Sequence, residues 1–179
     1  DAVMGAYLVQ DHRFLDAFLT LLGGAIASAD GFQARLRLGR FAGMVSGDEN
    51  DYFLRSFAAL GISDAARAAI PDSAPTAGFQ AIMREAAATR SYAAILAVLT
   101  VAEWLYLDWA SRAPRPLPGT FVHAEWITLH DNPFFRDFVA FLRDELDRVG
   151  PGAEAQAREP AAQTPALIRA ALRLLAPKE

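Results

Sequence analysis

Apolar residues recur at every third or fourth position through most of this sequence, and this spacing limits the fold more than any other feature. In the first segment Met4, Leu8, Leu15 and Leu22 belong to one such stripe. Side chains spaced in this way share one face of an α-helix, whereas strands need an alternating pattern of β-branched residues, which is nearly absent. The sequence therefore predicts an all-α fold.

Capping residues and turn formers divide the chain into predicted helices. Gly23 and Gly24 are expected to end the first helix, and Gly61 to follow the third as a C-cap glycine. Thr76 and Asn132 are expected N-caps. The predicted helices cover residues 2–22, 31–45, 47–60, 76–89, 91–112, 121–130, 132–149 and 163–176, and the second and third are expected to be continuous.

The whole chain of 179 residues is expected to form a single domain. It begins inside a predicted helix, so an N-terminal segment is expected to be missing. Residues 150–162, rich in Gly, Pro, Ala and Gln, are expected to form a flexible linker to the last helix. Hydrophobic residues make up 53% of the chain, slightly more than in an average soluble domain, which suits a helical protein that also buries surface in a homo-oligomer.

Composition argues against several classes of protein. The net charge of -4 and the scattered Lys and Arg argue against a nucleic-acid partner. The absence of cysteine excludes disulfides, thiol catalysis and thiolate metal sites, and fits a cytoplasmic protein. The longest apolar stretch, residues 92–107, is interrupted by Glu103 and is shorter than the ~20 residues that span a bilayer, so no membrane segment is expected.

Asp11 interrupts the first apolar stripe between Leu8 and Leu15. A buried carboxylate must be hydrogen-bonded, paired or neutralised, so Asp11 either caps a neighbouring helix, pairs with a buried Arg, or binds a ligand. Tyr7 and Phe14 lie one turn away and would line a cavity around it. Flat apolar walls around one acceptor suit a planar aromatic ligand that carries an amino group.

Glu103 is a second acid that interrupts an apolar stripe. It is the one charged residue between Arg90 and Asp108. Tyr106 follows it at i+3 on the same side of the predicted helix. In a low dielectric this carboxyl would have a raised pKa and serve as a general base near neutral pH, and the alternative is an ion pair with an Arg of another helix. Two acids on inner helix faces predict a polar pocket inside a helical core.

Glu49 is a third candidate, in the segment GDENDYFLRSF, with Tyr52 following one turn later. Both side chains are candidates to bind a substrate in the predicted pocket. The neighbouring Asp48 and Asp51 favour the alternative that Glu49 belongs to a solvated run of charge.

The three histidines have poor spacing for a metal site. His12 is adjacent to Asp11 but about a quarter turn away, His123 lies near a loop end, and the paired Glu-x-x-His helices of a carboxylate-bridged di-iron site are absent. Glycine-rich phosphate loops are absent too, so neither a metal nor another cofactor is expected. His130 shares a helix face with Trp126 and would reach the pocket, with a buried, hydrogen-bonded histidine as the alternative.

Four segments occur together in the order of a known family, namely YLVQDHRFLDAF, GDENDYFLRSFAALGI, GFQAIMREAAATRSYAAILAVLTVAEWLYLDWA and EWITLHDNPFFRDFVAFLRDELD. Their order and spacing resemble the TenA, or thiaminase II, family (TENA/THI-4/PQQC) of the haem-oxygenase-like superfamily over residues 5–149. The resemblance implies a multi-helix bundle around a central enclosed pocket, assembled into dimers or tetramers.

The same resemblance implies a small-molecule aminopyrimidine ligand, which is hydrolysed at its substituent during salvage of the thiamin pyrimidine. Asp11 matches the carboxylate that binds the aminopyrimidine. Phe14, Phe79, Tyr106 and His130 match pocket positions that the commoner branch fills mostly with tyrosines.

The sequence departs from the thiaminase branch at two positions. Ala102 stands where that branch carries a nucleophilic cysteine, and Glu103 matches the glutamate of a second branch, which acts on degraded thiamin such as the formylaminomethyl pyrimidine. The family's late glutamate has no counterpart, since Leu174 or Leu175 stands about where it is expected.

The leading hypothesis is therefore an aminopyrimidine hydrolase. Glu103 would deprotonate water, Asp11 would hold the amine, and Tyr52 or Tyr106 would donate to the developing oxyanion. One alternative is a small-molecule-binding or regulatory protein that has lost catalysis, and a weaker one is a redox enzyme similar to the PqqC branch.

Overall fold

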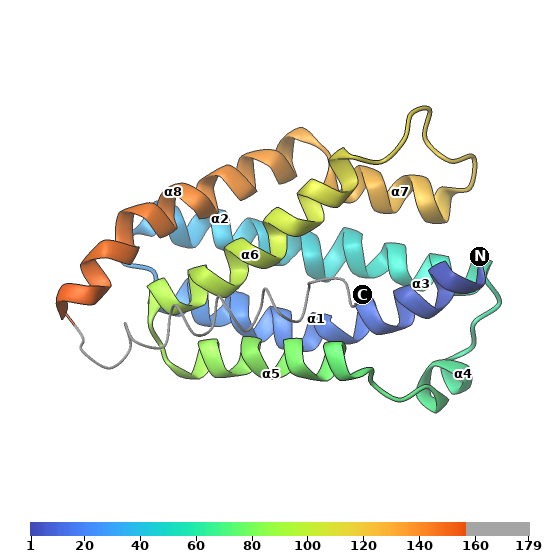
Figure 1. Cartoon of the computed structure of the whole chain (residues 1–179), viewed down its shortest axis with the longest axis horizontal. Coiled ribbons are helices and arrows are strands. Elements are labelled where there is room, and N and C mark those ends of the chain that lie inside the picture. The colour runs from blue at the N-terminus through green and yellow to red at the C-terminus, as the bar shows by residue number, and fades with distance from the viewer. Residues whose placement is uncertain (157–179) are drawn as a thin grey trace, which may run out of the picture.

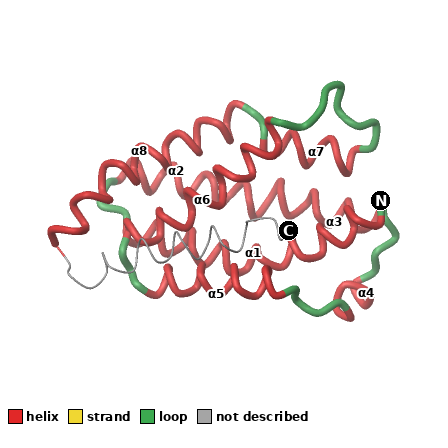
Figure 2. The backbone as a smooth tube through the Cα atoms, in the orientation of Figure 1, coloured by secondary structure: helices red, strands yellow, loops and turns green. Residues whose placement is uncertain are grey.

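The structure, a computed structural model, describes residues 1–156, and these residues form a helical bundle without a strand (Figures 1 and 2). The all-α prediction is therefore confirmed. The elements are α1 (Ala2–Ser28), α2 (Phe32–Met44), the π-helix η1 (Val45–Glu49), α3 (Asn50–Ala59), α4 (Asp64–Ala69), α5 (Ala74–Ala88), α6 (Tyr92–Ser111), α7 (Phe121–His130) and α8 (Pro133–Gln156).

Helix α6 crosses the bundle obliquely and contacts α1, α5, α7 and α8 (Figure 1). Every residue from Tyr92 to Thr100 is buried, so the first half of α6 is apolar on all sides, as expected of a core helix. By length and composition α6 could also cross a membrane, since it has 20 residues and a mean hydropathy of 1.5, but 67% of that segment is buried inside the bundle. The helix lies within the predicted span 91–112, and burial in the bundle rather than length identifies it as a core helix.

The first helix does not end at Gly23 and Gly24, contrary to the prediction, but continues to Ser28. A Cβ at position 24 would lie 3.3 Å from Cδ1 of Ile95 and 3.4 Å from Cβ of Ala87. Glycine at this position therefore allows α1 to approach α5 and α6 closely. The packing outweighs the roughly 1 kcal/mol by which glycine disfavours a helix interior.

Several helix ends follow the predicted chemistry. Gly61 has a φ of 68° and follows α3 in the left-handed conformation, as predicted. The Oδ1 atom of Asn132 accepts a 2.9 Å hydrogen bond from the backbone N–H of Phe135, and Pro133 is the first residue of α8. Helices α2 and α3 are continuous through η1, also as predicted.

The segment between α3 and α6 differs more from the prediction. Helix α4 was not predicted, and α5 begins at Ala74 with Ser73 rather than Thr76 as its N-cap. The Ser73 Oγ atom accepts a 3.2 Å hydrogen bond from the Thr76 backbone N–H. Helix α8 extends to Gln156, so residues 150–156 are not a linker, while the rest of residues 150–162 and the predicted helix 163–176 lie outside the described residues.

Replacing Ser73 by alanine is expected to lower the free energy of unfolding by about 1 kcal/mol, because the first turn of α5 loses its side-chain cap. Urea denaturation followed by circular dichroism measures this change. The matched control is Ser46→Ala, since Ser46 is exposed and its hydroxyl donates to the carbonyl of Gly43, three residues earlier in the chain. Equal unfolding midpoints for the two variants would show that the cap does not stabilise α5.

Candidate functional site

Asp11 lies on the buried side of α1 and is only 6% exposed. The Tyr106 hydroxyl donates a 2.5 Å hydrogen bond to its Oδ1 atom. Burial raises the pKa of Asp11 from 3.8 to about 6, although the hydrogen bond from Tyr106 opposes this shift. Within residues 1–156 no Arg pairs with Asp11 and it caps no helix, so both structural alternatives are wrong there.

Glu103 is 4% exposed on α6, and no hydrogen bond or ion pair to its carboxylate occurs in the part of the chain that the structure describes. Burial, followed by the negative charges of Glu49 and Asp11, raises its pKa well above the ordinary value of 4.5. Glu103 therefore holds its proton more tightly than an exposed glutamate does. The alternative of an ion pair with an Arg is not found among these residues.

Glu49 joins these two acids in the interior. It is the last residue of the π-helix and is 7% exposed, whereas its neighbours Asp48 and Asp51 are exposed. A π-helical turn adds one residue to the repeat, which turns the residues after it relative to those before it. The prediction of a wholly solvated run of charge is therefore wrong for Glu49.

His130, at the end of α7, faces Glu49. Its Nε2 lies 3.7 Å from Glu49 Oε1, and its Nδ1 lies 2.8 Å from the Trp126 carbonyl oxygen, to which it donates. Burial lowers the pKa of His130, but the hydrogen bond and the charge of Glu49 outweigh burial, so the net pKa is raised. This contact therefore favours the protonated, imidazolium form of His130.

A cavity of about 160 Å³, called here the ring cavity, opens beside Asp11 between α1, α5 and α6. It is lined by Tyr7, Gln10, Asp11, Phe14, Pro75, Thr76, Phe79, Tyr106 and Trp109. Cavities of roughly 150 Å³ hold a single benzene ring, so this volume suits one six-membered ring with small substituents.

The aromatic walls of the ring cavity are stacked against one another. The ring centroids of Phe14 and Phe79 are 5.9 Å apart with an interplanar angle of 17°, and those of Phe14 and Tyr106 are 6.1 Å apart at 13°. Inserting another ring between two parallel rings needs a separation of about 7 Å. A flat ligand therefore stacks against this set of rings, or the rings move apart to admit it.

The remaining predicted residues lie outside the lining of the ring cavity. Glu49, Glu103 and His130 form the acid cluster, and Tyr106 connects it to the cavity because its ring also stacks on His130 at a centroid distance of 4.9 Å. Tyr52 is fully buried, and its hydroxyl donates a 2.6 Å hydrogen bond to the Val122 carbonyl, so this donor is already in use. One enclosed central pocket that contains all these residues stays a prediction.

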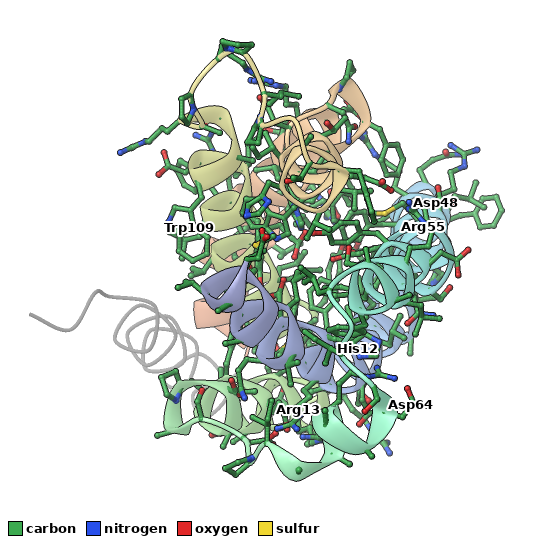
Figure 3. All side chains as sticks on the ribbon, turned by 90° about the vertical axis from the view of Figure 1, so that its right-hand side faces the viewer. His12, Arg13, Asp48, Arg55, Asp64 and Trp109 are labelled. Atoms are coloured by element: carbon green, nitrogen blue, oxygen red, sulfur yellow. The ribbon has the colours of Figure 1, made fainter. Side chains whose placement is uncertain are left out.

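Sequence reasoning missed four residues of the lining. Gln10 and Thr76 meet at the rim, where Gln10 Oε1 accepts from the Thr76 hydroxyl at 2.8 Å and from the Ser73 backbone N–H at 2.9 Å. Trp109 projects from α6 on the opposite side of the bundle from His12 (Figure 3). The spacing of Trp109, three residues after Tyr106, was the one available signal. Gln10, Pro75 and Thr76 come together only through the loop before α5.

A sequence model of the TENA/THI-4/PQQC family matches residues 2–167 of the chain. The chain belongs to the TENA/THI-4/PQQC family. Membership in this family supports a thiamin-related function in the broad sense, and it confirms the resemblance seen in the sequence.

Two solved structures share the fold of this TENA/THI-4/PQQC protein. A TenA family transcription regulator from Silicibacter sp. TM1040 aligns with 97% of this chain and 77% of its own, with a TM-score of 0.78 and 19% identity. A TenA homologue from Pyrococcus furiosus aligns with 96% of this chain and 80% of its own, with a TM-score of 0.77 and 16% identity. At these identities the likeness establishes a common TenA-like fold.

One curated protein shares a short segment with the chain. The match to the Holliday junction branch migration complex subunit RuvA of Paracoccus denitrificans (strain Pd 1222) is 89% identical over 27 residues. It covers 15% of this chain and 12% of RuvA. A segment of that length does not relate the helical bundle of this TENA/THI-4/PQQC protein to RuvA.

In residues 1–156 of this TENA/THI-4/PQQC protein, no three His, Asp or Glu side chains are arranged to hold a metal ion. The charge of Glu49 instead adds to burial in raising the pKa of Asp11 and of Glu103. That the protein uses neither metal nor cofactor stays a prediction.

The buried acids make the folding stability of this TENA/THI-4/PQQC protein depend on pH. Because folding raises the pKa of Asp11 from 3.8 to about 6, the folded state binds more protons than the unfolded state in that interval, and stability falls as pH rises through it. The shift in the pKa of Asp11 corresponds to about 3 kcal/mol in the free energy of unfolding. The raised pKa values of Glu103 and His130 also lower the stability as pH rises, at higher pH.

Urea unfolding of the wild-type protein is therefore expected to show a higher free energy of unfolding at pH 5 than at pH 8. Asp11→Asn removes the ionising group and is expected to flatten the profile between pH 4 and 6. Identical profiles for the two proteins would show that Asp11 does not ionise within that range.

Proposed function

We propose that this protein is an aminopyrimidine hydrolase in salvage of the thiamin pyrimidine, which releases the aminomethyl pyrimidine from a degradation product such as the formylaminomethyl pyrimidine. The observation that carries this proposal is a buried carboxyl group, Asp11 on α1, in the lining of a cavity of about 160 Å³ that suits one ring. A second buried carboxyl group, Glu103 on α6, is close enough for the charge of Asp11 to raise its pKa. Family membership supports the thiamin-related part of the proposal.

Asp11 is proposed to bind the exocyclic amine of the pyrimidine. Its carboxylate accepts hydrogen bonds, and Phe14 and Phe79 provide apolar ring faces on the same cavity. The Tyr106 hydroxyl already donates to one carboxylate oxygen, so the amine would use the other. This arrangement would fix both the plane and the rotation of the ring.

Glu103 is proposed to act as the base in hydrolysis of the amide. It would take a proton from water while the water oxygen bonds to the formyl carbon. The oxyanion would need a donor other than Tyr106, whose single hydroxyl proton is already donated to Asp11. The carbon–nitrogen bond then breaks, and the proton passes from Glu103 to the leaving nitrogen, so that formate and the aminomethyl pyrimidine are the products. Since the pKa of Glu103 is raised, the rate should increase with pH as this group ionises.

Water rather than a side chain is the proposed nucleophile. Ala102, beside Glu103, is buried and offers no nucleophilic atom, and the chain contains no cysteine. A covalent thioether intermediate is therefore excluded from this proposal. Formylated or free aminomethyl substituents fit better than a displaced thiazole ring.

A second candidate is a binding or regulatory protein that does not turn over its ligand. Glu103 does not line the ring cavity, and the Tyr52 hydroxyl is already bonded to Val122. Both features favour binding without catalysis unless the ligand opens the site.

The two candidates are separated by incubating the full chain with the formylaminomethyl pyrimidine and measuring formate and the aminomethyl pyrimidine by chromatography. Stoichiometric release above the buffer rate supports the hydrolase. Tight binding measured by calorimetry without product would select the binding protein instead.

We also propose that the protein is a cytoplasmic homo-oligomer, a dimer or a tetramer. Trp104 and Phe134 are large apolar side chains that remain 47% and 46% exposed, which supports an interface between copies. Light scattering coupled to size-exclusion chromatography tests this assembly, and a monomer at micromolar concentration would contradict it.

A further inference from the structure

A second cavity, of about 320 Å³, adjoins the ring cavity and lies between the start of α1, the end of α6 and α7. We call it the side cavity. Tyr7 and Trp109 line both cavities, so the two spaces meet at this pair of side chains. The two neighbouring cavities together are therefore larger than a single ring requires.

The volumes assign different parts of a ligand to the two cavities. The ring cavity is about 160 Å³, which an aminopyrimidine ring with its methyl group already fills. A substituent larger than a few atoms must leave this cavity. The side cavity has twice the volume and begins at the same two residues.

Two buried donors near this boundary, the Tyr7 hydroxyl and the Trp126 Nε1 atom, make no hydrogen bond of normal geometry to any of residues 1–156. The Tyr7 hydroxyl nevertheless lies close to Asp11, Tyr106 and Trp126, and burial followed by the charge of Asp11 raises its pKa. The two rings meet edge to face at a centroid distance of 6.0 Å, so both donors belong to one small region. Buried donors without partners are unfavourable, and a single ligand oxygen that accepts from them would relieve this.

The lining of the side cavity is poor in charged side chains, which disfavours charged ligands. No Lys, Arg, Asp or Glu belongs to its described lining, and His123 is its one histidine. The Nδ1 atom of His123 lies 2.7 Å from the Thr120 hydroxyl oxygen, with which it shares a hydrogen bond. A phosphorylated or carboxylated substituent would therefore lose its hydration without gaining a partner.

We propose that the side cavity binds the acyl part of the substrate, an uncharged apolar group whose carbonyl oxygen accepts hydrogen bonds from Tyr7 and Trp126. This inference rests on the proposed function, because the ring cavity must hold the aminopyrimidine. It widens the substrate class from the formyl compound to N-acyl aminomethyl pyrimidines with larger apolar acyl groups.

Ketone analogues, in which a methylene group replaces the amide nitrogen, test the inference without turnover. Calorimetry on the full chain compares the parent aminopyrimidine with its methyl ketone, phenyl ketone and carboxyethyl ketone. The phenyl ketone is expected to bind at least about tenfold more tightly than the methyl ketone, and the carboxyethyl ketone at least about tenfold more weakly than the methyl ketone.

Two variants locate this effect. Ala113→Phe fills the side cavity, and it is expected to reduce the advantage of the phenyl ketone to less than about twofold. Trp126→Phe keeps an aromatic ring but removes the N–H, and it is expected to lower the affinity of the methyl ketone relative to the parent ring by about fivefold. Ala140→Phe, on an exposed position of α8, is the matched control and should keep the wild-type ratios.

The outcomes separate this inference from the proposed function. If the parent aminopyrimidine does not bind, both are wrong. If it binds but the phenyl ketone binds no more tightly than the methyl ketone, only the assignment of the side cavity is wrong. Circular dichroism shows whether Ala113→Phe folds, and Trp126→Phe gives an independent result if it does not.

Discussion

Replacing Glu103 by glutamine is expected to lower the rate of formylaminomethyl pyrimidine hydrolysis by about 10²–10⁴-fold, because the amide cannot take a proton from water. The substitution keeps the size of the side chain and removes a carboxyl group that is buried among other acids. Initial rates of formate release measure the effect. Affinity for the product amine, measured by calorimetry, should change by less than about threefold, because Asp11 rather than Glu103 is proposed to bind the ring.

Glu85→Gln is the matched control for this experiment, since Glu85 is exposed on α5 and lines no described cavity. Its rate should equal that of the wild-type protein. Equal rates for Glu103→Gln and Glu85→Gln would remove Glu103 from the mechanism. The wild-type rate should also rise with pH as Glu103 loses its proton, whereas a fall over the same interval would show that the protonated acid is the active form.

Replacing Asp11 by asparagine is expected to weaken binding of the aminopyrimidine by about 100-fold. The asparagine amide group places a donor where the ligand amine needs an acceptor, and the negative charge is lost. Calorimetric titration with the aminomethyl pyrimidine measures the change. Because Asp11 must be ionised, wild-type affinity should also increase as pH rises through about 6, the pKa of this group.

Asp16→Asn provides the comparison on the same helix, because Asp16 is exposed and pairs with Arg84 at the surface. Its affinity for the ring should match that of the wild-type protein. If Asp11→Asn also bound the ring with wild-type affinity, the amine would have another partner, and the proposed orientation of the ring would be wrong.

The relation between sequence and structure differs from one part of the site to another. Asp11 and Glu103 each interrupt an apolar stripe, and the spacing within a single helix is enough to predict that both face the interior, as they do. Glu49 could not be placed in this way, because the π-helix changes the register at this residue and its acidic neighbours are exposed. The spacing of residues along the sequence no longer predicts which residues are buried where the backbone departs from the regular helical repeat.

Some helix ends were predicted from the sequence, and others depend on tertiary packing. Gly61 and Asn132 were predicted correctly because each satisfies backbone groups within a few residues of itself. Gly23 and Gly24 were not, because the preference of glycine to end a helix is weaker than the packing of α1 against α5 and α6. Ser73 replaced Thr76 as the cap because Gln10, 63 residues earlier in the chain, holds the turn before α5.

The amino-acid sequence by itself determined the helical class, the family and the two inward-facing acids, since each depends on residue spacing along one helix or on the order of short segments. Only the tertiary structure decided that Tyr106 bonds to Asp11, that His130 faces Glu49, and that two cavities meet at Tyr7 and Trp109. These features join helices that are far apart in the chain. Their geometry depends on how the helices pack, which no local pattern specifies.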